Sequence, residues 1–189
     1  QVVVSGDVDA DRLADRLDGL LGDLPPGDEI GQPLVGAARA PEGIEQEKIE
    51  RKQNQSVVLC AWPGPMTPSE ERVPLMLLRE VLNGQSGRLF EVLRNRQSLC
   101  YNTGVLGTAG FGQGMFVGYV LTAPETAVQA RDALVGELAG MTADLVPADE
   151  FERARTQLLG NIQISSQSNG ARVGRGLRYR VYGRGADDL

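Results

Sequence analysis

Residues 82–101 read LNGQSGRLFEVLRNRQSLCY, and they carry more structural information than any other part of the chain. The stretch combines a helix end, a turn with two glycines, and a short apolar helix predicted over residues 87–96. A strand is predicted to follow over residues 99–108. Arg94 lies near the end of this helix, and Tyr101 lies near the start of the strand. A helix, turn and strand in this order can direct both side chains to one place.

The remaining elements follow from hydrophobic periodicity and from turn residues. Helices are predicted over residues 10–22, 73–83, 124–140, 147–166 and in a last stretch to about 182. Strands are predicted over residues 2–5 (buried), 46–53 (at a sheet edge), 56–62 (central) and 114–122. Several strands are adjacent in sequence, and their alternation with helices is irregular. The pattern therefore predicts an α+β fold, in which helices pack on one face of a largely antiparallel sheet.

Three segments are predicted from composition. Residues 1–24 form a strand and a helix at the junction with a preceding half of a longer protein, and residues 25–43, rich in Pro, Gly and Ala, form a linker. Residues 44–189 form the main domain. The chain begins with Gln1 inside a strand-like run, so we expect it to be part of a longer polypeptide.

Charge and composition exclude several function classes. The 19 basic residues against 25 acidic ones give a net charge of −6, which disfavours nucleic-acid binding through a basic surface. The apolar runs are far shorter than a membrane span, and the N-terminus shows no signal peptide. Nothing in the sequence decides between the bacterial cytoplasm and the periplasm.

The donor residues that structural zinc sites use are largely missing. The chain has no histidine and no Cys-x-x-Cys pair, so the sequence predicts no metal site in this chain. Cys60 and Cys100 stand in apolar runs and are predicted to be buried as small hydrophobic residues. Spacing alone leaves a disulfide between them open.

Arg94 and Tyr101 are the candidate site residues. A guanidinium offers fixed donors with a permanent charge, and a phenol offers a hydroxyl at the end of a rigid ring. Peptide hydrolysis builds negative charge on the carbonyl oxygen, where such donors stabilise the transition state. From the residues alone, solvated surface groups are the ordinary explanation. The same explanation holds for a cluster of arginines near the C-terminus: Arg172, Arg175, Arg178, Arg180 and Arg184. The alternative is a basic face that binds phosphate, an acidic peptide or an acidic partner domain.

The stretch 82–101 closely resembles the signature of the C-terminal half of the pitrilysin/insulinase-type (inverzincin) zinc metallopeptidases, which include the mitochondrial processing peptidase and its bacterial relatives. The matching words are LNG, SGRLF, LR and LCY, although Cys100 stands where Gly or Ala is usual. CAWPGP resembles the central strand of that family. LTAPETAVQARDAL and PADEFERARTQLLGNI resemble its two long helices, so the resemblance covers nearly the whole chain.

This resemblance implies a metallohydrolase-type domain in which Arg94 and Tyr101 reach the substrate peptide and the reaction intermediate. The zinc motif of the family, His-x-x-Glu-His, is absent here, so no zinc ligand and no general base can be assigned. The resemblance places the zinc in an N-terminal half or in a partner subunit, and this chain alone is expected to be inactive. Its expected role is substrate binding and oxyanion stabilisation in a zinc endopeptidase that cleaves peptides or unfolded proteins.

One alternative stays open at this point. Some relatives of the family are inert scaffold or core subunits of larger complexes, and the intact Arg–Tyr pair argues modestly against that role here. We also expect weak self-association of the isolated chain, because a separated half can expose apolar surface that its other half covers.

Overall fold

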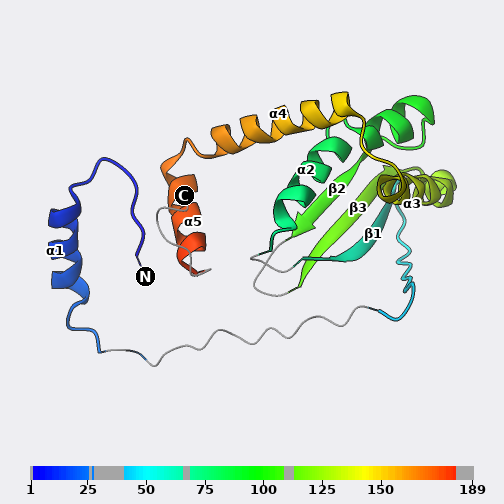
Figure 1. The fold of residues 1–189 in the computed structure, drawn as a ribbon. Coiled ribbons are helices and arrows are strands. Elements are labelled where there is room, and N and C mark those ends of the chain that lie inside the picture. The colour runs from blue at the N-terminus through cyan, green and yellow to red at the C-terminus, as the bar shows by residue number, and fades with distance from the viewer. Residues whose placement is uncertain (1, 26, 28–40, 66–68, 109–112, 182–189) are drawn as a thin grey trace. The chain divides into compact units, whose positions relative to one another are not determined.

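The computed structural model divides into two compact units, residues 1–34 with 162–189, and residues 35–161 (Figure 1). The residues it describes are 2–25, 27, 41–65, 69–108 and 113–181. Most of the predicted linker, residues 25–43, lies outside the described residues. Each unit is considered by itself below.

The second unit is built on a three-stranded antiparallel sheet. Its strands are β1 (Ser56–Gly64), β2 (Asn102–Thr108) and β3 (Gly114–Thr122), in the order β1-β3-β2. Leu59 of β1 pairs with Tyr119 of β3, and Gly104 of β2 pairs with the same residue from the other side. This register places alternate residues on opposite faces of the sheet.

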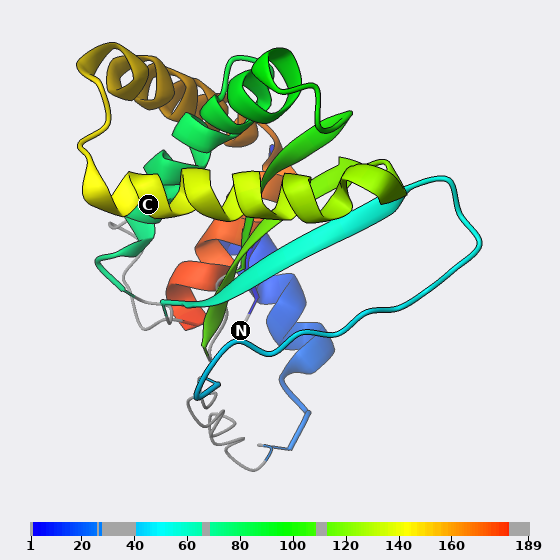
Figure 2. The same cartoon turned by 90° about the vertical axis from the view of Figure 1, so that its right-hand side faces the viewer.

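Helices cover one face of this sheet, as the sequence predicts. They are α2 (Arg72–Leu82), the π-helix η1 (Phe90–Arg96), and α3 (Ala127–Ala143), which a short 3-10 turn η2 (Pro124–Thr126) precedes. Figure 2 shows α3 lying across the sheet along β1. The fully buried apolar side chains come from these helices, their flanks and the sheet: Leu82, Leu89, Leu93, Val105, Val120 and Leu134. The α+β architecture with one helix-covered face is therefore confirmed.

The opposite face of the sheet is apolar and exposed. Val57 and Leu59 of β1 are 60% and 64% exposed, and Leu106 of β2 is 53% exposed. A contiguous apolar patch of this kind is typical of an interaction surface. It is the surface on which the predicted weak self-association would depend.

The first unit contains α1 (Ala10–Leu21), α5 (Asn169–Val181) and the extended residues before α1. Asp9 caps α1 as predicted, accepting a hydrogen bond of 3.0 Å from the Arg12 N–H. The Ser5 hydroxyl lies 3.4 Å from the Asn169 side-chain oxygen, which ties the extended residues to α5. Neither helix has a buried residue. The helix α4 (Ala148–Ser165) begins in the second unit and ends in the first.

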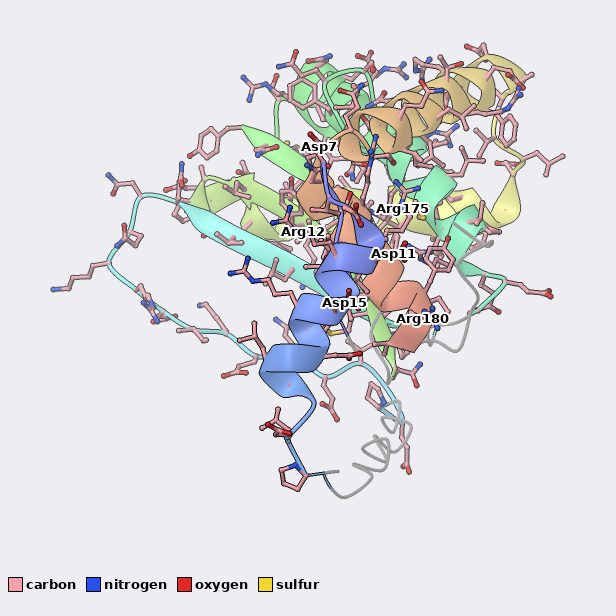
Figure 3. All side chains as sticks on the ribbon, turned by 90° about the vertical axis from the view of Figure 1, so that its left-hand side faces the viewer. Asp7, Asp11, Arg12, Asp15, Arg175 and Arg180 are labelled. Carbon is pink, nitrogen blue, oxygen red and sulfur yellow. The ribbon has the colours of Figure 1, made fainter. Side chains whose placement is uncertain are left out.

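The predicted arginine cluster lies mostly on α5. Figure 3 shows Arg175 and Arg180 on this helix and the acidic residues Asp11 and Asp15 on α1 of the same unit. Arg184 lies outside the described residues. Arg172, Arg178 and Arg180 are exposed and Arg175 is half-buried, which favours the ordinary explanation that these arginines are solvated surface groups.

Three strand predictions need correction. Residues 46–53 form no strand and are all exposed, because Ile49 is their only large apolar residue and cannot supply a buried face. Residues 2–5 form no strand in the described part of the chain, and Val2 and Val4 are exposed. The strand predicted as central, now β1, lies at an edge of the described sheet. Its sequence is almost entirely apolar because one face of the strand packs against α3 and the other face is apolar although it is exposed.

The helix predictions agree with the structure to within a few residues, apart from one difference of type. The helix predicted over residues 87–96 is a π-helix over Phe90–Arg96. Among the described residues, every helix is too short or too polar to span a lipid bilayer.

Candidate functional site

Arg94 is positioned by the π-helix η1. The buried side chains of Leu89 and Leu93 anchor this helix in the core, so the next residue, Arg94, faces outward. The Gln97 N–H bonds to the Val92 carbonyl at 3.1 Å, which is the five-residue step of a π-turn. Such turns are frequent at functional sites because the widened backbone redirects a side chain.

Tyr101 is positioned by the start of the sheet. Its N–H donates to the Leu121 carbonyl at 3.0 Å, which ties it to β3. Just before it, the buried Thr122 hydroxyl donates to the Leu99 carbonyl at 2.5 Å and fixes the approach of the chain. Ser98, in the turn between, has a φ of 53°, a left-handed conformation that a non-glycine residue adopts at a cost.

The structure brings Arg94 and Tyr101 together. The Arg94 Nη1 donates a hydrogen bond to the backbone carbonyl of Tyr101, and the guanidinium carbon lies 5.2 Å from the centre of the Phe90 ring. The Tyr101 side chain is 45% exposed, so its hydroxyl is not consumed by the core. The contact fixes the Arg94 guanidinium beside the residue that directly precedes β2.

Both side chains line one pocket of about 560 Å³ in the second unit. Its lining holds two arginines and two tyrosines but no carboxylate, although the chain as a whole is acidic. The lining residues are Arg79, Asn83, Gly84, Gln85, Phe90, Arg94, Tyr101, Asn102, Thr103, Val105, Leu106 and Tyr119. The only charged groups of this lining are two guanidinium donors, so the pocket suits a ligand that accepts hydrogen bonds.

Asn83 is a pocket residue that the sequence analysis did not single out. Its Nδ2 donates to the Val105 carbonyl at 2.9 Å, and its Oδ1 accepts from the Val105 N–H at 2.7 Å. The Asn83 amide thus makes the two backbone hydrogen bonds that a neighbouring strand would make at the outer edge of β2. The only sequence signal was its place in the helix end Leu-Asn-Gly, because a contact across 22 residues leaves no local pattern.

Gly104 keeps space for this arrangement. A Cβ atom at this position would lie 2.7 Å from the Asn83 Oδ1 and 3.0 Å from the Tyr119 hydroxyl. Glycine therefore allows the Asn83 amide and the Tyr119 ring to approach β2 closely. The sequence analysis also missed Tyr119, whose hydroxyl reaches this pocket from β3.

Replacing Asn83 by alanine is expected to destabilise the fold by about 1–3 kcal/mol. The reason is that the backbone N–H and the carbonyl of Val105 both lose their part-buried hydrogen bond to the Asn83 side chain. Urea unfolding measures the change. The matched control is Asn95→Ala, which removes an exposed amide whose hydrogen bond goes to Glu91, and it should change the unfolding free energy by less than about 0.5 kcal/mol. Equal effects of the two substitutions would contradict the assigned role of Asn83.

A second pocket of about 520 Å³ has a different character. Its charges pair internally: Arg88 bonds to Glu150 at 2.9 Å, and Arg96 bonds to Glu91 at 3.2 Å. Hydrogen bonds from Asn95 and Arg96 lower the pKa of the Glu91 carboxyl, so this carboxylate stays ionised. Since Arg88 and Arg96 already have partners and four carboxylates line the pocket, it offers less to an incoming anion.

The chain does not fit a zinc ion. It has no histidine, and no group of three or more Cys, Asp or Glu side chains in the described residues is arranged to hold a metal. Both cysteines are free. Burial raises the pKa of the Cys60 thiol and of the Cys100 thiol, and the charges of Arg131 and Arg94 respectively oppose that rise. Protonated, half-buried thiols are poor metal ligands and poor nucleophiles.

Comparison with known families decides the assignment. The family model described as the peptidase M16 inactive domain matches residues 1–158. The chain belongs to the peptidase M16 inactive-domain family. An uncharacterized zinc protease of Rickettsia bellii is 28% identical over 139 residues, which cover 72% of this chain and 34% of that protein. The chain thus spans about a third of that relative.

Solved structures support the fold. The peptidase M16 inactive domain from Pseudomonas fluorescens matches with a TM-score of 0.66 and 20% identity, over 72% of this chain and 33% of that one. A protease from Helicobacter pylori matches with a TM-score of 0.84 and 15% identity, over 95% of this chain and 44% of that one. This M16 domain is therefore a non-catalytic domain of a zinc-protease family, as the resemblance in residues 82–101 implies.

Proposed function

We propose that this M16 inactive domain is the substrate-side half of a zinc-dependent endopeptidase, whose zinc and general base belong to another half. The observation that carries the proposal is the shared pocket of Arg94 and Tyr101, which offers hydrogen-bond donors and no carboxylate. The absence of histidine is consistent with this division of labour. The substrate class is peptides or unfolded protein segments.

The chemistry follows from the two side chains. When a peptide bond is attacked, its carbonyl oxygen gains negative charge, and donors already fixed at that position stabilise the charge without reorganising. Arg94 is held by its bond to the Tyr101 carbonyl and by the Phe90 ring, so its guanidinium is preorganised. The Tyr101 hydroxyl supplies a neutral donor. Both groups would also position the peptide before the reaction.

A scaffold role is the second candidate. The exposed apolar face that Val57, Leu59 and Leu106 share would suit a core subunit that docks onto other proteins. An inert scaffold, however, has no need for a pocket rich in donors. The two roles differ in one measurable property, which is whether the assembly cleaves peptides.

A reconstitution assay on a quenched peptide library tests the proposal. We expect no cleavage by the 189-residue chain alone. We expect cleavage when the zinc-bearing half is present, in the same polypeptide or as a separate subunit, and this activity should be lost with a chelator and restored by zinc. Silence of the complete assembly would favour the scaffold role instead.

A further inference from the structure

Arg79 is a second cationic residue in the pocket that holds Arg94. It lies on α2, and its Nε is buried without a hydrogen-bond partner, the one such side-chain atom in the described part of the chain. Its stem lies over β2, where the Cδ would be 3.3 Å from a Cβ atom placed on Gly107. A buried donor without a partner costs about 1–3 kcal/mol, so the Arg79 Nε needs an acceptor, which either an ordered water or a bound ligand can supply.

Arg79 and Arg94 share a pocket that holds no carboxylate. Neither forms an ion pair with a carboxylate in the part of the chain that the structure describes, and the pocket between them has no acidic lining residue. The neighbouring carboxylate of Glu80 is directed elsewhere, toward the Asn161 amide at 3.4 Å. Some described cations have carboxylate partners and others, such as Arg72 and Arg153, have none among the described residues, so the distinguishing feature of Arg79 and Arg94 is the pocket that they share.

We propose that this pocket binds a carboxylate of the peptide substrate and that Arg79 is the residue that selects it. The inference rests on the proposed function, in which Arg94 and Tyr101 face the reacting peptide bond. A guanidinium binds a carboxylate through two parallel hydrogen bonds, which gives geometric selectivity as well as affinity. The carboxylate is either an Asp or Glu side chain or the C-terminal carboxylate of a short peptide. Asn102 and the Tyr119 hydroxyl supply neutral donors on the same lining.

The test uses the complete enzyme, with its zinc-bearing half, and matched peptides. The peptides of the first pair carry either Glu or Gln at one internal position, and this position is moved along the peptide in a series of such pairs. The peptides of the second pair have either a free or an amidated C-terminus. We expect kcat/KM to favour the carboxylate form by about 10- to 100-fold in at least one pair, the range of a charge-assisted hydrogen bond. Arg79→Gln should reduce this ratio to near one. Arg96→Gln, in the other pocket, should leave it as in the parent.

The two pairs distinguish the source of the carboxylate. A ratio confined to the Glu/Gln pair identifies an acidic side chain, and a ratio confined to the second pair identifies the C-terminus; either result supports the proposal. A parental ratio near one, or a ratio that survives Arg79→Gln, would overturn it.

Equilibrium binding separates this inference from the proposed function. Fluorescence anisotropy of the same labelled peptides on the complete protein needs no hydrolysis. If the assembly cleaves nothing but binds the carboxylate peptides more tightly through Arg79, the proposed function fails and the anion site stands. If it cleaves peptides without preferring carboxylates in turnover or in binding, the anion site fails and the proposed function stands.

Discussion

Turnover of peptide by the complete enzyme is expected to fall by about 10²–10³ when Arg94 is replaced by alanine, because one preorganised donor at the developing oxyanion is lost. Tyr101→Phe removes only a hydroxyl and should lower turnover by a smaller factor. Arg94→Lys keeps the charge but loses the planar fork, so it should recover only part of the rate. Steady-state kcat on one cleaved peptide measures all three.

Arg96→Ala is the matched control for Arg94. It removes the same residue type from the same helix, but Arg96 is bound to Glu91 and lines the other pocket. We expect this control to turn over peptide at the parental rate. Arg94→Ala should lower the thermal unfolding temperature only by the contribution of its lost hydrogen bond to the Tyr101 carbonyl. Equal kinetic effects at positions 94 and 96 would show that charge on the helix, and not the pocket, matters.

Gly87→Ala is expected to have the largest effect on stability. A Cβ atom there would lie 2.1 Å from the Asn83 carbonyl oxygen and 2.7 Å from the Leu82 carbonyl oxygen. These are backbone atoms that cannot rotate away, so the turn between α2 and η1 has to open. That opening displaces the Asn83 amide and the buried Leu82 together, and we expect a loss of about 4 kcal/mol or more.

The midpoint of urea unfolding measures this loss. Gly136→Ala is the matched control, because an added Cβ in α3 meets nothing within 4 Å and alanine favours a helix by about 1 kcal/mol over glycine. The control should therefore be equal to or more stable than the parent. A parental unfolding free energy for Gly87→Ala would show that the turn tolerates a side chain and would weaken the account of how α2 positions η1.

Local patterns predicted the helices well because their signals are local. Asp9 caps α1, and the leucines of residues 73–83 and 87–96 repeat at helical spacing, so bounds and buried faces could be derived. The strand at residues 46–53 was wrong because alternation without several apolar residues gives no buried face. The edge position of β1 could not be predicted, because the order of strands in a sheet is a non-local property.

The site was predicted only in part for the same reason. Arg94 and Tyr101 were found through a resemblance, and their placement in one pocket agrees with that hypothesis, while their roles stay proposals. Tyr119 and Arg79 carry no sequence signal, and Asn83 has only its place in the helix end Leu-Asn-Gly. Each acts through a contact with a distant strand, as the bond from Asn83 to Val105 shows. Only the folded chain brings these groups to the same lining.

The most direct test of the central claim measures zinc content and peptide turnover on the same preparations of the complete enzyme. The parent is compared with a variant carrying both Arg94→Ala and Tyr101→Phe. If this domain supplies the substrate side and not the metal, zinc content stays at the parental level while turnover falls by at least about 10²-fold. Parental turnover, or a loss of zinc in proportion to the loss of activity, would contradict the account.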